Sequence, residues 1–303
     1  MIAFVLSGGG SRGALQVGAL RALLERGIHP DMLVGTSVGG LNAAFAAVDP
    51  SLARIETLAS LWRTVRRTDI YPDNKLRVAW RLARGHGSLY SNETFLRYIQ
   101  RQYAGVEMLS QLEGARCYIV VTNLDTGAMR VMGDRPTDRV VDAIMATTAL
   151  PPLHPPYPLD DGEYVDGGAV ALLPIEVALE RGARQIYALH IVDGPVPPIA
   201  RRTVLHVSGK AIGALVQRQW QTSVALAGSR GVRLHHIQLS PPVPCSVSDY
   251  TKSDMLIQAG YEQTVAFLDA VPPIETWRQR AWRHASGFLP RKRLPSATAD
   301  AKA

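Results

Sequence analysis

Ser37 is the first residue whose surroundings suggest chemistry. It lies in Gly35-Thr36-Ser37-Val38-Gly39, which matches the Gly-x-Ser-x-Gly pattern of a nucleophile elbow. An apolar segment precedes the serine and helix-forming residues follow it, so the pattern predicts a strand, a sharp turn and a helix. Gly35 and Gly39 leave room for the turn, and the first N–H groups of the helix would stabilise negative charge beside the serine. Small residues also cluster in buried turns without chemistry, so this pattern alone leaves both interpretations open.

A second glycine-rich stretch, Gly8-Gly9-Gly10-Ser11-Arg12-Gly13, follows the apolar segment Ile2–Ser7. Backbone N–H groups in such a loop, at the start of a helix, can surround an anion. The spacing fits a dinucleotide fingerprint and equally fits a loop that supplies oxyanion-hole donors. Asp31 precedes the next strand, Met32–Thr36, instead of ending it, which disfavours a ribose-binding role. The oxyanion interpretation is favoured because the two strands would end side by side in a parallel sheet.

A serine hydroxyl needs a base to become a good nucleophile. Histidine is the usual base, but none of the eight histidines has a sequence context that indicates catalysis; they are residues 29, 86, 154, 190, 206, 235, 236 and 284. A carboxylate can also serve. Asp166 follows an apolar strand residue and precedes Gly167 and Gly168, which predicts an acid held at a strand end with backbone close beside it. An ordinary β-turn beginning at an aspartate is the alternative.

Taken together and in this order, the three blocks resemble the patatin-like phospholipase family. Two further stretches are similar to the family, residues 146–151 (Ala-Thr-Thr-Ala-Leu-Pro) and residues 256–261 (Leu-Ile-Gln-Ala-Gly-Tyr). The resemblance covers roughly residues 2–270. It implies a three-layer α/β/α sandwich around a mostly parallel central sheet, and a Ser–Asp dyad that uses no histidine, no metal and no cofactor. One departure is local: Ala169–Leu173 replace the asparagines that the family commonly has before its proline, here Pro174.

The resemblance also implies a role for each matching residue. Ser37 would be the nucleophile and Asp166 the general base. The oxyanion hole would use the N–H groups of Gly9 and Gly10, with Val38 as a further donor, inside a loop completed by Gly8 and Gly13. Arg12 holds the basic position of the loop, where it would brace the loop or attract a phosphate.

The remaining chain alternates between strand and helix patterns, which favours an α/β protein. We expect further strands at residues 115–121, 129–132, 185–192 and 233–239, and helices at residues 140–149, 174–181, 209–227 and 253–270. Residues 1–272 would form one hydrolytic domain with a basic helical insertion at about residues 52–103. Residues 273–303 would form a basic C-terminal helix and a disordered tail.

Composition sets the broad class. The chain has 303 residues, 47% of them hydrophobic, which is enough for a full core. Its two cysteines do not make a disulfide framework and suit a reducing compartment. The N-terminus resembles a first strand more than a signal peptide, and no apolar run approaches the ~20 residues of a membrane span. We therefore expect a cytoplasmic protein or one peripheral to a membrane.

The net charge of +7 comes from an arginine-rich set of cations. Between Trp62 and Tyr103 nine basic residues face three acids, and residues 274–303 add a basic segment with apolar residues at helical spacing. Such segments predict contact with anionic lipid headgroups, and a solvated basic surface explains them equally well. The substrate would be a phospholipid, a lysophospholipid or another acyl ester, with no nucleic acid partner expected.

Four functions remain in competition, the fourth being the dinucleotide binder that the glycine loop leaves open. The first is a serine acyl hydrolase of the phospholipase A or lysophospholipase type. The second is a lipid transacylase, which hands the acyl group to another alcohol. The third is a non-catalytic membrane-binding module that keeps the fold, although such a module has no need to retain Ser37, Asp166 and Arg12 together.

Overall fold

The protein's computed structural model describes residues 1–71, 75–85, 87–103, 105–194 and 204–270. Within these ranges eight strands form one sheet in the order β5-β6-β3-β2-β1-β7-β8, with β4 paired to β3. The strands are β1 (Ile2–Leu6), β2 (Met32–Thr36), β3 (Arg116–Asn123), β4 (Met129–Met132), β5 (Tyr157–Leu159), β6 (Gly162–Asp166), β7 (Gln185–Ile191) and β8 (Arg233–Leu239).

Five of these strands run parallel, and β4, β5 and β6 run antiparallel to their neighbours. This confirms the mostly parallel central sheet. Strand β1 lies directly beside β2, with Leu6 opposite Gly35. The glycine loop that follows β1 and the serine that follows β2 therefore leave the sheet at the same edge.

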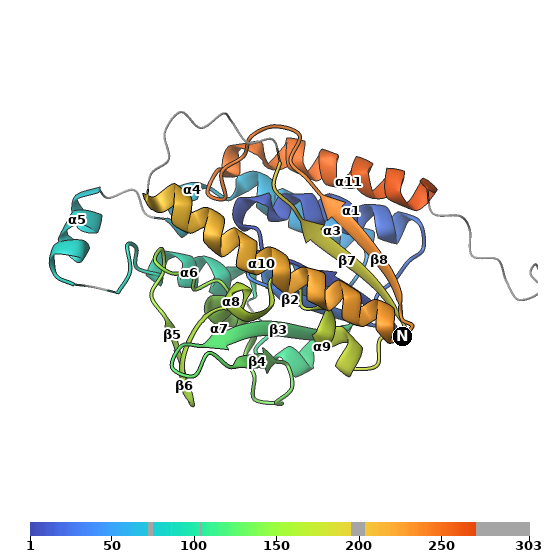
Figure 1. The fold of residues 1–303 in the computed structure, drawn as a ribbon, viewed down its shortest axis with the longest axis horizontal. Coiled ribbons are helices and arrows are strands. Elements are labelled where there is room, and N and C mark those ends of the chain that lie inside the picture. Colours follow the sequence, from blue (N-terminus) through green and yellow to red (C-terminus); the bar gives the residue numbers. More distant parts are fainter. Residues whose placement is uncertain (72–74, 86, 104, 195–203, 271–303) are drawn as a thin grey trace, which may run out of the picture. The chain divides into compact units, whose positions relative to one another are not determined.

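Helices cover both faces of the sheet, as the three-layer expectation requires (Figure 1). Helices α1, α2, α7 and α11 lie on one face, and α8, α9 and α10 on the other. Within the described ranges the helices are α1 (Ala14–Glu25), α2 (Val38–Val48), α3 (Leu52–Thr64), α4 (Arg67–Ile70), α5 (Lys75–Ala83), α6 (Glu93–Gln102), α7 (Val140–Thr147), α8 (Gly168–Ala171), α9 (Ile175–Glu180), α10 (Val204–Ser229) and α11 (Ser253–Ala270). Three short 3₁₀ turns are η1 (Gly10–Gly13), η2 (Leu109–Gln111) and η3 (Tyr250–Lys252).

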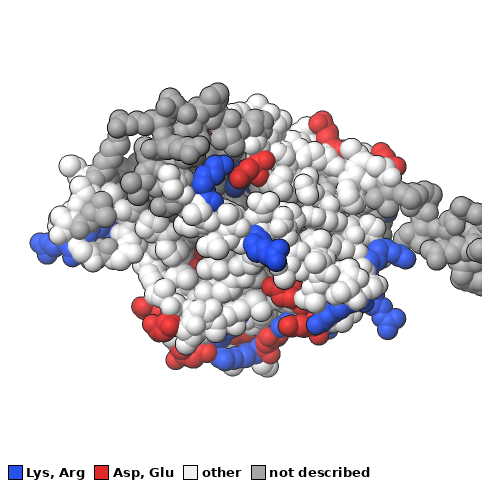
Figure 2. Space-filling view, in the orientation of Figure 1, with Lys and Arg blue, Asp and Glu red and all other residues white. Residues whose placement is uncertain are grey.

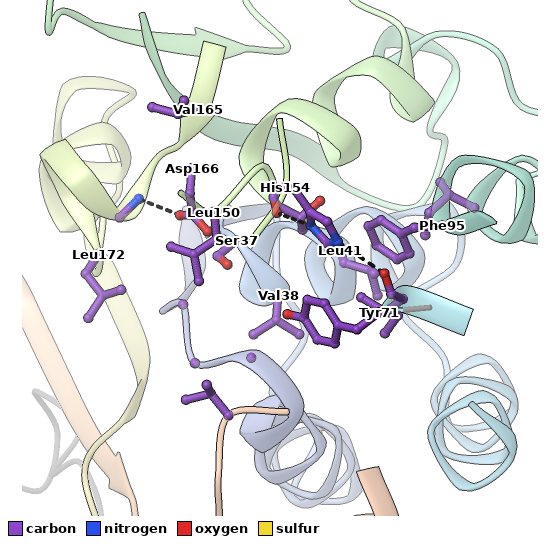
Figure 3. A pocket seen from close by; sticks show the side chains of 18 of the residues that line it. Ser37, Val38, Leu41, Tyr71, Phe95, Leu150, His154, Val165, Asp166 and Leu172 are labelled. Carbon is purple, nitrogen blue, oxygen red and sulfur yellow. Dashed lines mark hydrogen bonds between the residues drawn. The ribbon is translucent and has the colours of Figure 1, made fainter. Parts of the chain in front are cut away.

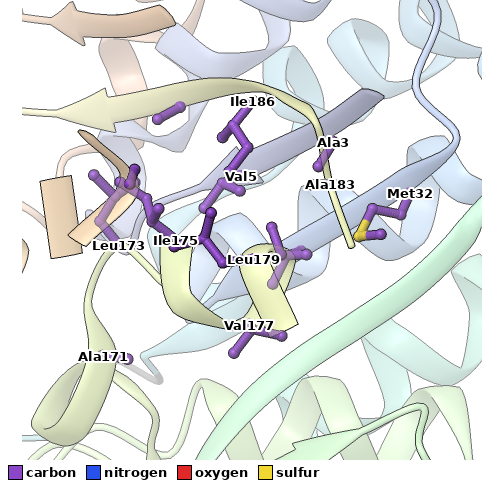
Figure 4. Packing of buried hydrophobic residues seen from close by; sticks show 14 of the residues in the cluster. Ala3, Val5, Met32, Ala171, Leu173, Ile175, Val177, Leu179, Ala183 and Ile186 are labelled. Atoms are coloured by element: carbon purple, nitrogen blue, oxygen red, sulfur yellow. The ribbon is translucent and has the colours of Figure 1, made fainter. Parts of the chain in front are cut away.

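The core on the α9 face is built from alternate strand residues (Figure 4). Ala3 and Val5 of β1 and Ile186 of β7 point to this face, where Ile175 and Leu179 of α9 meet them. The intervening residues, such as Phe4 and Leu6, are fully buried as well. Because helices cover both faces, these strands are apolar at nearly every position rather than at every second one.

Most expected elements are present with shifts of a few residues at their ends. Helix α10 begins at Val204, earlier than expected, and α7 ends at Thr147, before the expected end. Helix α8 was not expected from the sequence. The helix expected within residues 273–303 lies outside the described residues. Among the helices of the described ranges, none is long and apolar enough to cross a membrane.

Candidate active site

Ser37 occupies the turn between β2 and α2 in a strained conformation. Its backbone has φ 55° and ψ −130°, and in the described part of the chain it is the only residue other than glycine with a positive φ. Such a conformation costs of order 1–3 kcal/mol, which the surrounding structure must offset. A Cβ atom at Gly35 would collide with the Gly39 carbonyl, and one at Gly39 with the Leu6 carbonyl. Both glycines of the pattern are thus required by close backbone contact.

A buried threonine anchors this turn. The Thr147 hydroxyl accepts a hydrogen bond from the Ser37 N–H at 2.8 Å and donates one to the Val120 carbonyl at 2.6 Å. Thr147 is fully buried at the end of α7, so one side chain ties the elbow to β3. The sequence drew attention to residues 146–151 only through the family resemblance, and no local pattern indicated this contact.

Asp166 ends β6 beside the serine. Strand β6 pairs with β3, which pairs with β2, and this places the carboxylate next to the elbow. The Gly168 N–H donates to Asp166 Oδ1 at 2.7 Å, and the Ser37 hydroxyl interacts with the same carboxylate. Figure 3 shows the two side chains adjacent to each other, with the Gly168 bond on the far side of the carboxylate. A side chain at Gly167 would collide with the Val120 carbonyl.

Burial sets the electrostatics of Asp166. The residue is only 4% exposed. Burial raises the pKa of its carboxyl group to about 6, and the hydrogen bonds from Ser37 and the Gly168 backbone oppose that rise. At neutral pH the carboxylate is mostly ionised, yet it is a stronger base than an exposed aspartate. These are the properties that a general base toward a serine hydroxyl requires.

The glycine loop presents two backbone donors. The Gly8 N–H donates a hydrogen bond to the Leu172 carbonyl at 3.1 Å, and the Ser11 N–H donates one to the Val247 carbonyl at 2.8 Å. Between them, the N–H groups of Gly9 and Gly10 form no hydrogen bond within the described ranges. Gly10 has φ 61°, and a Cβ atom there would collide with Val247. Gly8 thus closes the loop, while Gly9 and Gly10 remain as donors.

Arg12 braces this loop. Its Nε donates to the Gly9 carbonyl at 3.2 Å, and its Nη1 pairs with Asp193 at 3.0 Å. The Arg12 side chain is 14% exposed. Of the two roles that the sequence left open, bracing the loop therefore has direct contacts to support it.

A buried polar network joins the glycine loop to the elbow helix. The Asn42 amide donates to the Gly13 carbonyl and to Gln16, and it accepts a hydrogen bond from Trp62 Nε1, each at 3.0 Å. Gln16 continues to the Ser7 carbonyl at 2.8 Å. Gly13 itself lies so close to Val38 that a side chain there would collide. Local patterns gave no sign of this network, because its members are separated in sequence.

The structure also bears on the alternatives that the sequence left open. Asp31 Oδ2 accepts a hydrogen bond from the Ile2 N–H at 2.6 Å, at the start of β1, whereas the glycine loop lies at the end of that strand. Asp31 and the glycine loop thus lie at opposite ends of β1, which argues against a dinucleotide site. His154 lines the same pocket as Ser37, but its ring nitrogens contact the Thr148 and Ile70 carbonyls at 3.3 and 3.1 Å. It therefore has no ring nitrogen directed at Ser37 (Figure 3).

A pocket of about 440 Å³ opens at Ser37. Its walls are mainly aliphatic and aromatic, and they come from α2, α3, α4, α6, the segment after α7, and α10. Residues lining it include Leu41, Phe45, Leu58, Trp62, Ile70, Phe95, Ile99, Leu150, Ile212 and Leu215. Besides Ser37 and Asp166, polar side chains are a minority of the lining. Tyr71, whose ring stacks on His154 at 5.1 Å, has a hydroxyl that interacts with that of Tyr250. The approach of α10 to the pocket was not predicted from the sequence.

Within the described ranges, no three or more His, Cys, Asp or Glu side chains are grouped so that they could hold a metal ion. The groups that converge on Ser37 are a carboxylate, backbone N–H donors and apolar walls. That set can bind a neutral ester with an apolar chain and polarise its carbonyl group.

The fold and the site geometry define an α/β protein with a serine elbow, an adjacent buried aspartate and a glycine loop. The sequence profile of the patatin-like phospholipases matches residues 4–179. The chain therefore belongs to the patatin-like phospholipase family.

Individual proteins agree with this assignment. The chain is similar to patatin-like phospholipase domain-containing protein 6 of Homo sapiens, with 32% identity over 193 residues that cover 63% of this chain and 13% of that protein. It is also similar to lysophospholipase NTE1 of Mycosarcoma maydis, with 32% identity over 201 residues that cover 63% of this chain and 10% of that protein. The chain thus matches a small part of these longer relatives. Among solved structures, VipD of Legionella pneumophila has a similar fold, with a TM-score of 0.50 and 16% identity over 88% of this chain and 66% of that one.

Proposed function

We propose that this chain is a serine acyl hydrolase that cleaves phospholipids, lysophospholipids or related long-chain acyl esters. Ser37 is the nucleophile and Asp166 the general base. The observation that carries the proposal is the adjacent pair of Ser37 and buried Asp166 at an apolar pocket of about 440 Å³. Ligand sites of this kind are usually apolar cavities of about 300–1,000 Å³ with a few well-placed polar groups.

The first step is acylation of the serine. The Asp166 carboxylate accepts the Ser37 proton as Oγ attacks the ester carbonyl carbon. Negative charge develops on the carbonyl oxygen, and the N–H groups of Gly9 and Gly10, with Val38 at the start of α2, stabilise it. Losing one such donor typically costs ~10²–10³ in rate. The tetrahedral intermediate then collapses, and the alcohol leaves with the proton that Asp166 accepted.

The second step is hydrolysis of the acyl-enzyme. Water attacks the acyl carbon, Asp166 accepts a proton from the water, and the same N–H donors stabilise the second oxyanion. The fatty acid is released and the proton returns to Ser37 Oγ. Asp166 thus acts first as a base and then as an acid in each half of the reaction.

The apolar walls support a lipid substrate. Leu41, Phe45 and Leu58 bring side chains of α2 and α3 to one cavity, where an acyl chain would leave water. Each buried methylene contributes about 0.8 kcal/mol to binding, so longer chains should bind more tightly until the cavity is filled.

The test compares p-nitrophenyl esters of increasing chain length on wild type and Ser37→Ala. The proposal expects turnover by wild type only, with kcat/KM rising from short to medium acyl chains. Equal turnover by Ser37→Ala would refute the role of the serine. Product analysis with an added alcohol separates hydrolysis from transacylation, because a transacylase forms a new ester at the expense of free fatty acid.

A further inference from the structure

Helix α10 is supported along only part of its length. Its C-terminal half is held firmly: the Gln219 side chain bonds the Leu172 N–H and the Ala169 carbonyl at 3.0 and 3.1 Å, and Ser223 bonds Glu176 at 2.8 Å. Trp220 packs against the rings of His190 and His236 beneath it. This half of the helix is fixed to the sheet and to the segment that follows Asp166.

Among the residues that the structure describes, few pack beneath the N-terminal half. We call residues 207–218 the overhang. Val207, Ile212 and Leu215 are 55%, 61% and 73% exposed, and a Cβ atom added at Gly209 or Gly213 would meet no described neighbour within 4 Å. Large aliphatic side chains exposed together on one helix are unusual on a protein surface that faces only water.

The position of the overhang connects it to the active site. Ile212, Leu215 and Val216 line the same pocket as Ser37. They stand four or fewer residues apart on α10, so they share one face of the helix. A surface that covered this face would therefore lie over the entrance through which an acyl chain reaches the serine.

The charge of the helix favours one kind of surface. Helix α10 contains no acidic residue over its 26 positions, whereas the overhang carries Lys210 and Arg218. In Figure 2 the described surface below the left half of α10 is largely white, and acidic and basic side chains are mixed along the lower edge of this view. A helix with exposed aliphatic residues, two cations and no acid matches the boundary between anionic headgroups and acyl chains.

We infer that the overhang is the membrane-docking surface of this protein, and that it inserts Ile212 and Leu215 into an anionic bilayer beside the pocket. The inference rests on the proposed function, because it explains how a lipid passes from the bilayer to Ser37 without crossing water. It also assigns the anionic contact to a surface that the sequence did not single out.

The test measures vesicle binding without turnover. The full chain carrying Ser37→Ala is floated with vesicles of phosphatidylcholine alone and of phosphatidylcholine with phosphatidylglycerol. Two further variants are built on this background, Leu215→Ser and the pair Ile212→Ser/Leu215→Ser. The matched control is Leu52→Ser, because Leu52 is 46% exposed at the start of α3 and is not among the described residues that line the pocket. Circular dichroism and thermal melting check that each variant is folded.

The expected result is binding that requires phosphatidylglycerol, that falls about tenfold or more for the double variant, and that Leu52→Ser leaves unchanged. The inference is overturned if the Ser37→Ala chain does not bind vesicles, or if the double variant binds as tightly as Leu52→Ser. Hydrolysis of a soluble ester by the chain with Ser37 intact is measured separately. If the chain with Ser37 intact does not hydrolyse the ester, the proposed function is refuted. If it does, but the Ile212→Ser/Leu215→Ser variant binds vesicles as tightly as Leu52→Ser, only the docking surface is refuted.

Discussion

Replacing Asp166 by asparagine should stabilise the protein while it removes the base. Burial raises the pKa of this carboxyl group from an ordinary value of about 4 to about 6. Two pKa units correspond to about 3 kcal/mol, which is the cost that the native state bears when Asp166 is ionised. Between pH 4 and pH 6 the native protein binds more protons than the unfolded chain, so this group lowers the stability of wild type as pH rises through that window.

The assay is urea unfolding of wild type and Asp166→Asn from pH 4 to pH 8. The stability of Asp166→Asn relative to wild type should increase by up to about 3 kcal/mol from pH 4 to pH 7 and remain constant above it. Asp161→Asn is the control of opposite sign. Burial raises the pKa of the Asp161 carboxyl group, but the Tyr164 hydroxyl, Arg130 and Arg135 together lower it below its ordinary value. That variant should lose stability, with the larger loss at higher pH. A relative stability of Asp166→Asn that is flat or falling with pH would refute the electrostatic account of the site.

Three further predictions follow from the contacts around the dyad. The kcat/KM of wild type for a soluble ester should rise about tenfold per pH unit below pH 6 and level off above it, because Asp166 must be ionised to accept a proton. A kcat/KM that stays constant down to below pH 5 would contradict the role of Asp166 as the base. Thr147→Val should lower the free energy of unfolding by about 2–5 kcal/mol and reduce kcat, because it leaves the Ser37 N–H and the Val120 carbonyl without a buried partner. Thr147→Ser keeps the hydroxyl and should retain most of the stability and most of kcat. Equal stability and equal kcat in the two variants would contradict the role of the Thr147 hydroxyl in holding the turn at Ser37. Gly10→Ala should reduce kcat by at least 10² while Gly27→Ala, at another positive φ but with open space around it, should not.

The sequence indicated the fold because its strands carry strong local signals. Ile2–Leu6 and Met32–Thr36 are short apolar runs followed directly by glycine-rich turns, and a parallel pair is the simplest way to bury both. Strands β2, β4 and β8 have the expected bounds. The beginning of α10 was predicted less well: the sequence pattern placed it at residue 209, whereas the helix begins at Val204.

The parts of the site that could be predicted are those marked by glycines beside a functional residue in the sequence. Gly35, Gly39 and Gly10 are visible in sequence because each allows a backbone contact that a side chain would block. Thr147 and Asn42 act through hydrogen bonds to residues far away in the chain. No periodicity marks such hydrogen-bond partners. They became apparent only when the structure placed α2 and α7 beside β2 and β3.

The most direct test of the account is covalent labelling of the purified protein with a fluorophosphonate, followed by mass spectrometry of the peptides. The account predicts one modified serine, Ser37, in wild type, much slower labelling in Asp166→Asn, and none in Ser37→Ala. Labelling of a different serine, or ester hydrolysis that persists in Ser37→Ala, would contradict the central claim that Ser37 and Asp166 form the catalytic dyad.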